Sequence, residues 1–197
     1  MHIDYKTEFL EAFIEASSLF GINQATLDKV STQIYHHPKG YIADFYFGLT
    51  DVIKSIEETL DNKLTSNQEI LNIKSVTEKI KLSLYLRVTS QGPIFARMLH
   101  NYYKTLQGIQ IFYKIKFRTS DVIWRLAGDK SLDFNYYSKR ILLFNVYTKS
   151  LHNYAITNNI EETKVCIDTS IENTLKLSRY KPSLILEKIP FIRLLVK

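Results

Sequence analysis

Apolar side chains recur three and four residues apart along most of this chain, which is the spacing of one face of an α-helix. The first such run contains Phe9, Phe13, Ala16 and Phe20 and ends at Gly21. This pattern predicts an all-α fold of about nine to ten helices. The further helices are expected over residues 25–35, 38–48, 50–62, 66–91, 94–106, 109–127, 131–154 and 159–178.

One segment allows a second interpretation. Ile109, Ile111, Tyr113, Ile115 and Phe117 alternate as they would in a β-strand. A single strand would have no partner in an otherwise helical chain, and its backbone N–H and C=O groups would go unpaired. The helix is therefore favoured, with the strand as the alternative.

Composition restricts the class of protein. The chain has 197 residues, of which 45% are hydrophobic, so it can form one core, and no apolar run has the length of a transmembrane helix. Cys166 is the only cysteine, which excludes an intramolecular disulfide and a multi-thiolate metal site. Residues 2–13 have neither a secretory apolar core nor an Arg-rich transit pattern, so we expect a cytoplasmic location.

Motifs for catalysis are absent from the sequence. There is no Gly-x-Ser-x-Gly elbow, no glycine-rich phosphate loop and no His-Glu-x-x-His pair. His36 and His37 are adjacent, so on a helix they diverge by about 100° and cannot chelate one metal. His100 and His152 are expected at the edge of the core or in solvent, and Cys166 is expected to be a buried, inert thiol. We predict a protein that is not an enzyme, with no catalytic residues, metal or cofactor.

The net charge of +6 is distributed unevenly along the chain. Residues 1–100 carry a net charge of −2, and residues 101–197 carry +8. A basic surface can indicate nucleic-acid binding, but here the excess lies at the C-terminal end.

That end combines apolar side chains with flanking cations. Residues 181–197 are rich in Leu and Ile, a composition that suits an anionic bilayer surface, and Pro190 prevents one continuous helix. The alternative is a last core helix packed on the body. The predicted membrane contacts are Lys188, Phe191, Ile192, Arg193, Leu195 and Lys197.

The most distinctive stretch is 121–140, which contains a tryptophan, a Gly-Asp turn and then Asp133, Tyr136, Tyr137 and Arg140. The spacing i, i+3, i+4, i+7 places these four side chains on one helix face. One interpretation is a solvated helix start with half-buried tyrosines. The other is a protein-docking patch, in which Asp133 orients the partner or forms a salt bridge, the tyrosines supply apolar area and Arg140 supplies planar hydrogen bonds.

The order and spacing of these residues resemble the signature of a ubiquinone-biosynthesis accessory family, coenzyme Q protein nine. The resemblance covers roughly thirty residues. Leu132 stands where the family commonly has Thr, and Tyr136 stands where an indole is often seen. The resemblance rests on Trp124, Gly128, Asp129, Ser131, Asp133, Phe134, Asn135, Tyr137, Arg140, Leu142, Tyr147 and Thr148.

The N-terminal part resembles a second family, the TetR repressors, at the DNA-binding head. The matching residues are Pro38, Lys39, Gly40, Phe47, Gly48 and Asp51. A duplex-binding head needs several basic contacts to phosphate, whereas residues 24–50 contain only Lys29 and Lys39, balanced by two aspartates. We therefore expect a TetR-like bundle with a degenerate helix-turn-helix head that does not bind nucleic acid. A DNA-binding repressor with a hydrophobic ligand is the alternative.

Together the resemblances imply a non-catalytic, lipid-binding accessory protein of ubiquinone biosynthesis. Such a protein would bind a polyprenyl-quinone intermediate, or a phospholipid, and present its ligand to a membrane-associated hydroxylase. The implied organisation is a head at 1–62, a lipid-binding and dimerisation body at 63–180 and a membrane segment at 181–197. The protein would form a homodimer at the inner face of the cytoplasmic membrane. Phe112 and Leu143 are expected to line the lipid pocket.

Overall fold

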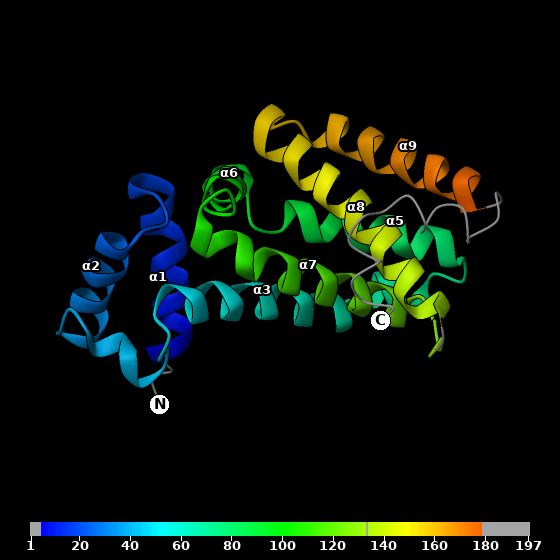
Figure 1. Ribbon diagram of the computed structural model, residues 1–197. Coiled ribbons are helices and arrows are strands. Elements are labelled where there is room, and N and C mark those ends of the chain that lie inside the picture. Colours follow the sequence, from blue (N-terminus) through cyan, green and yellow to red (C-terminus); the bar gives the residue numbers. More distant parts are fainter. Residues whose placement is uncertain (1–4, 133, 179–197) are drawn as a thin grey trace.

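The computed structural model describes residues 5–132 and 134–178, where every regular element is a helix (Figure 1). The all-α prediction is therefore confirmed for this part of the chain. Asp133 and the six predicted membrane contacts between Lys188 and Lys197 lie outside the described residues. The elements are α1 (Tyr5–Phe20), α2 (Gln24–Tyr35), the 3₁₀-helix η1 (Gly40–Ala43), α3 (Leu49–Thr65), α4 (Gln68–Asn72), α5 (Val76–Thr89), α6 (Pro93–Tyr102), α7 (Leu106–Leu126), α8 (Phe134–Thr157) and α9 (Ile160–Ser178).

Local sequence signals set several of these boundaries. The Asn23 side chain accepts a hydrogen bond from the Thr26 N–H at 3.0 Å to begin α2. Asn159, the first residue of the helix expected over 159–178, accepts hydrogen bonds from two backbone N–H groups at the start of α9. Residues 109–117 lie within α7, so the strand alternative for them is wrong.

Three predicted helices are divided or shortened. Residues 38–48 form only η1 and turns, because the Ser31 hydroxyl accepts the Tyr41 N–H and so replaces a helical partner. The long helix expected over 66–91 is two helices, since Ser75 accepts the Glu78 N–H and starts α5 after a break. The run over 94–106 ends at Tyr102, after which Thr105 caps α7.

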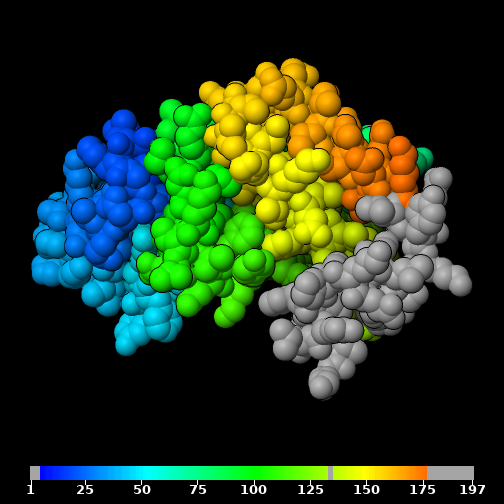
Figure 2. Space-filling view, turned by 45° about the horizontal axis from the view of Figure 1, so that its top comes forward, coloured from blue at the N-terminus to red at the C-terminus, as the bar shows by residue number. Residues whose placement is uncertain are grey.

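Two apolar cores lie along the molecule. The first joins α1, α2, η1 and most of α3 to α6 and the first half of α7. The second joins α4, α5, α8 and α9 to the ends of α3 and α7 and to Ala96 of α6. Figure 2 shows α1 and α2 in blue at one end, α9 in orange towards the other and α7 in green between them. Helices α3 and α7 pack against each other and pass through both cores (Figure 1).

The change from one core to the other falls within a short stretch of each long helix. On α3, Leu60 belongs to the first core and Leu64 to the second. On α7, Ile115 belongs to the first and Ile123 to the second. Charged side chains fill the interval between them, and they form one of the two sites described below. Within residues 5–132 and 134–178, no helix combines the length and the apolar character needed to cross a membrane.

Candidate functional site

A buried arginine holds the turn between α7 and α8. Arg140 is 1% exposed, and its Nε donates to Asp121 Oδ1 at 2.8 Å while its Nη1 donates to Asp129 Oδ2 at 2.6 Å. Asp121 lies on α7 and Asp129 lies in the turn, so one guanidinium joins two elements to α8. The planar hydrogen bonding expected of Arg140 is therefore directed inside this chain.

Asp129 is the centre of this turn. It also accepts hydrogen bonds from Lys139 Nζ at 2.6 Å and from the Ser131 hydroxyl at 2.8 Å. Burial opposes ionisation of Asp129, but the hydrogen bonds from Lys139 and Arg140 outweigh burial and lower its pKa. Gly128, at φ 89°, takes the left-handed conformation that ends α7. The turn is thus cross-linked by a carboxylate that stays ionised at neutral pH.

Aromatic side chains cover this network. Trp124 Nε1 donates to the Lys139 carbonyl at 2.9 Å, and the Tyr136 ring centroid lies 3.8 Å from the Arg140 guanidinium carbon. Tyr136 is half-buried, whereas Tyr137 is 57% exposed and Leu132 is 91% exposed. We call Leu132, Tyr136 and Tyr137 the turn surface. Of the predicted docking residues, Tyr137 faces solvent and Tyr136 packs on Arg140.

A second group of charges is fully buried between α3, α5 and α7. Arg87 Nη2 donates to Glu57 Oε2 at 2.6 Å, and Arg87 Nε donates to Asp61 Oδ1 at 2.8 Å. Lys116 Nζ donates to Glu57 Oε2 at 3.0 Å and to the Tyr147 hydroxyl of α8 at 3.0 Å. We call Glu57, Asp61, Arg87 and Lys116 the charge cluster. It links α3, α5 and α7 where the two apolar cores meet.

Burial and pairing compete within the charge cluster. Burial opposes ionisation of Glu57, but attraction to Arg87 and Lys116 outweighs it and lowers the pKa of Glu57 to about 2. Burial lowers the pKa of Lys116 to about 8, against the attraction of Glu57. Burial also raises the pKa of Tyr147 well above its ordinary value. At neutral pH Glu57 is therefore a carboxylate, Lys116 is an ammonium and Tyr147 keeps its proton.

One side of the charge cluster opens onto a row of aromatic rings. Lys116 Nζ lies 5.2 Å from the centroid of the Tyr103 ring, which meets Phe112 edge-on at 5.0 Å. Phe112 in turn contacts Phe144 at 5.7 Å, and Phe144 stacks on Tyr113 at 5.8 Å. Tyr103 is buried, Phe112 and Phe144 are half-buried, and Tyr113 is exposed. We call these four residues the aromatic row, which runs from the cluster to the surface of α7.

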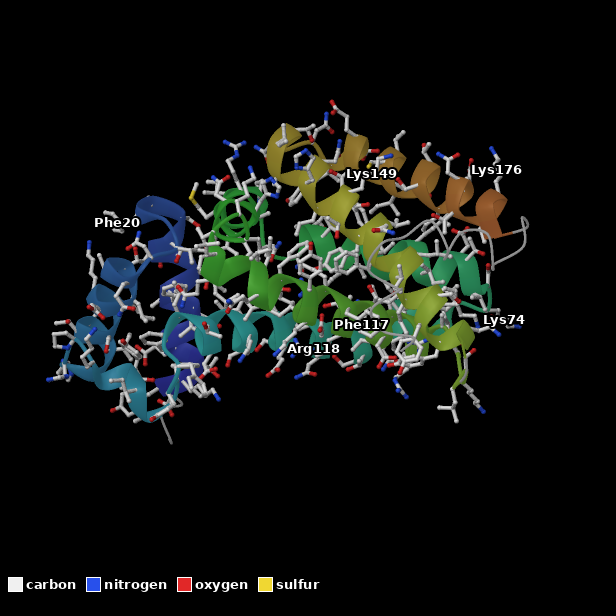
Figure 3. The ribbon with its side chains drawn as sticks, viewed as in Figure 1. Phe20, Lys74, Phe117, Arg118, Lys149 and Lys176 are labelled. Carbon is white, nitrogen blue, oxygen red and sulfur yellow. The ribbon has the colours of Figure 1, made fainter. Side chains whose placement is uncertain are left out.

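Further polar contacts involve Asp61 of the charge cluster. Arg118, labelled in Figure 3, pairs with Glu58 and donates to Asp61 Oδ2 at 3.3 Å. Thr119 donates its hydroxyl proton to Asp61 at 3.0 Å.

Leu143, one of the two residues expected to line the lipid pocket, is buried in the second core. Phe112, the other, belongs to the aromatic row.

A family model matches the helices that carry the turn and three of the four residues of the aromatic row. The COQ9 family model matches residues 109–178. That range covers most of α7 and the whole of α8 and α9.

A curated relative agrees with this match. "Probable ubiquinone biosynthesis protein coq9, mitochondrial" of Dictyostelium discoideum is 24% identical to this chain in an alignment 195 positions long that covers 90% of the chain. The chain spans 62% of that relative's length. The resemblance to the coenzyme Q protein nine family is thus confirmed. The resemblance to TetR repressors stays a prediction.

His100 on α6 is half-buried and His152 on α8 is exposed, so both lie at the edge of the core or in solvent as expected. The sequence did not indicate that they meet, with His152 Nδ1 3.2 Å from His100 Nε2. The COQ9-matched segment also contains Cys166, which is half-buried rather than buried. None of the four residues of the charge cluster was predicted from the sequence as a site residue. A usable signal was present, because Glu57 and Lys116 occur on the apolar sides of otherwise amphipathic helices.

Replacing Arg140 with Met should lower the free energy of unfolding by about 3 kcal/mol, because two carboxylates would lose a buried cation. The matched control is Arg125→Met. Arg125 bonds the same Asp121 but has a side chain that is 62% exposed, so its loss should destabilise the protein much less than the loss of Arg140. Urea unfolding followed by circular dichroism measures both. Equal losses would contradict the central role of Arg140.

The stability of the protein should depend on pH through Glu57. Its folded pKa of about 2 is below its ordinary value of 4.5, so its contribution is complete above pH 4.5 and is lost as pH falls towards 2. The contribution amounts to about 3 kcal/mol.

The test compares Glu57→Gln with the wild type by urea unfolding from pH 7 to pH 2. The variant should be less stable at pH 7, and the difference should shrink below pH 4.5. Glu58→Gln, at an exposed neighbouring position, is the control. A wild-type advantage that stays constant with pH would refute this assignment.

Proposed function

We propose that this chain is a non-catalytic accessory protein of ubiquinone biosynthesis. It binds a polyprenyl-quinone intermediate and presents it to a membrane-associated hydroxylase. The observation that carries the proposal is the COQ9 match over residues 109–178, which coincides with the helices that form the turn and most of the aromatic row. The Dictyostelium relative is named as a probable protein of ubiquinone biosynthesis, which indicates the pathway. The resemblance to the family supplies the accessory role.

The apolar interior supports the lipid part of this proposal. An isoprenoid tail is insoluble in water, so a carrier lined by apolar and aromatic side chains lowers the cost of removing it from a bilayer. The aromatic row offers such side chains in a graded sequence from exposed Tyr113 to buried Tyr103. Phe112 is its central residue, and Leu143 lies in the adjoining core.

The turn surface supports the partner part. Tyr137 and Leu132 expose rigid apolar area, and the ion pairs of Arg140 fix the backbone that presents them. A fixed loop loses little conformational entropy when a partner binds. We place the hydroxylase contact at the turn surface and Asp133, with Arg140 as the residue that positions it.

The pairing of basic side chains within the head favours this function over that of a DNA-binding repressor. Lys39 pairs with Asp28 at 3.1 Å, and Lys29 Nζ lies 3.8 Å from the centroid of the Phe20 ring. Both lysines of residues 24–50 are therefore engaged within the head. Duplex binding would require several cations directed towards phosphate.

The lipid proposal predicts that the full chain, purified without detergent from a bacterium that makes ubiquinone, carries an isoprenoid quinone or its phenolic precursor. Lipid extraction and mass spectrometry identify the ligand. Phe112→Asp should reduce its occupancy several-fold by placing a charge in the aromatic row, while Val165→Asp, on the exposed side of α9, should not. Wild-type protein that carries no lipid, or only phospholipid, would count against the proposal.

We further propose that residues 181–197 bind the inner face of the cytoplasmic membrane and that the bodies, residues 63–180, form a homodimer there. The full chain should float with anionic vesicles, because each basic residue near that surface contributes on the order of 1 kcal/mol. A chain ending at Arg179 should not float. The control is the full chain with Lys188, Arg193 and Lys197 all changed to Ser, which should bind zwitterionic and anionic vesicles equally weakly. Equal flotation of the full and shortened chains would place the membrane contact elsewhere.

A further inference from the structure

The charge cluster has hydrogen-bonding groups that its own members do not use. Arg87 Nη1 is buried and has no hydrogen-bond partner among the described residues. The Lys116 ammonium has three N–H groups, and its two described hydrogen bonds go to Glu57 and Tyr147. Buried polar atoms rarely stay unsatisfied. The cluster can therefore receive a further polar group that offers acceptors.

Tyr147 adds a further donor to this set. Its hydroxyl oxygen accepts the Lys116 hydrogen bond, and burial holds its pKa far above neutrality, so the hydroxyl proton remains available. The Tyr147 ring also lies 4.5 Å from Lys116 Nζ, beside the Tyr103 ring at 5.2 Å. Donors, an acceptor and two aromatic rings thus surround one ammonium group.

The charge of the cluster restricts what it can receive. Glu57 and Asp61 balance Arg87 and Lys116, and the adjoining Arg118 is balanced by Glu58. A phosphate-bearing head group would add an uncompensated charge to the interior, which is costly. A neutral head with ring oxygens would use the free donors and leave the balance intact.

The aromatic row supplies a path to this position. It begins at the exposed Tyr113, passes Phe144 and Phe112 and ends at Tyr103, each ring contacting the next. Its three helical members lie on α7 and α8 within the segment that matches the COQ9 family. An apolar tail lying along the row would place the attached head at Lys116.

From these observations we infer that the charge cluster is the head-group site for the bound lipid. The ligand class is a neutral phenol or benzoquinone ring with an apolar tail. Its ring oxygens accept hydrogen bonds from Tyr147, Lys116 and Arg87, and the tail follows the aromatic row outward. This assignment rests on the proposed function and specifies where the ligand's polar end lies.

The test uses two probes that differ only at the head. Decylubiquinone and decylbenzene have the same tail, but decylbenzene has no ring oxygens. Their affinities for the full chain are measured by displacement of the neutral fluorophore diphenylhexatriene. Tyr147→Phe should weaken decylubiquinone about tenfold, the effect of one lost hydrogen bond in a buried site, and leave decylbenzene unchanged.

Tyr154→Phe is the matched control, because Tyr154 is another buried tyrosine of α8 and lies two turns beyond Tyr147. It should change neither affinity. If Tyr147→Phe does not fold, the wild-type protein provides a second test, because the hydrogen bonds to the ring oxygens should make it bind decylubiquinone more tightly than decylbenzene. Circular dichroism and thermal unfolding confirm that each variant is folded.

The possible outcomes separate the two proposals. Wild-type protein that binds neither probe and carries no quinone would overturn the proposed function and this assignment with it. Wild-type protein that binds both probes, with variants that lose neither or lose both equally, would overturn the head-group assignment alone. Tighter binding of lysophosphatidylglycerol than of decylubiquinone would overturn the neutral-head assignment.

Discussion

The ion pairs of Glu57 determine how the two halves of the molecule fit together. Glu57 on α3 is bonded to Arg87 on α5 and to Lys116 on α7, and the three charges lie where one apolar core gives way to the other. Apolar contacts alone would permit these helices to slide, because neighbouring turns of Leu and Ile are nearly equivalent. A buried charge permits one register only, since any slip would leave it without its partner. The alignment of α3 with α7 therefore follows from electrostatics as much as from packing.

The helices themselves could be predicted from the sequence because their signals are local. The spacing of Phe9 and Phe13, the Asn159 cap and the Gly128 turn each act within a few residues, and the structure confirms all of them. The errors arose where two local signals compete. Over residues 66–91 the apolar stripe continues, but the Ser75 cap interrupts the helix, and the cap prevails.

The sites were less predictable because their contacts are distant in sequence. Spacing correctly placed Tyr136 and Arg140 together on α8, but it could not show that Asp121 and Asp129 draw Arg140 inward. Glu57 and Lys116 occur on the apolar sides of their helices, which indicates burial, but neither local pattern shows that the partner lies 59 residues away. The proposed head-group site and docking turn share α7, on which Lys116 and Asp121 lie five residues apart.

The buried pairing also limits how this chain can change over evolutionary time. Replacing Arg87 alone removes a buried cation from Glu57 and Asp61, and replacing Glu57 alone removes a buried carboxylate from Arg87 and Lys116, so each single substitution destabilises the fold. Viable alternatives require coordinated substitutions in helices encoded 30 and 59 residues apart. Among related sequences, these positions should therefore vary as a group or remain as they are, while the solvent-facing residues beside them drift independently.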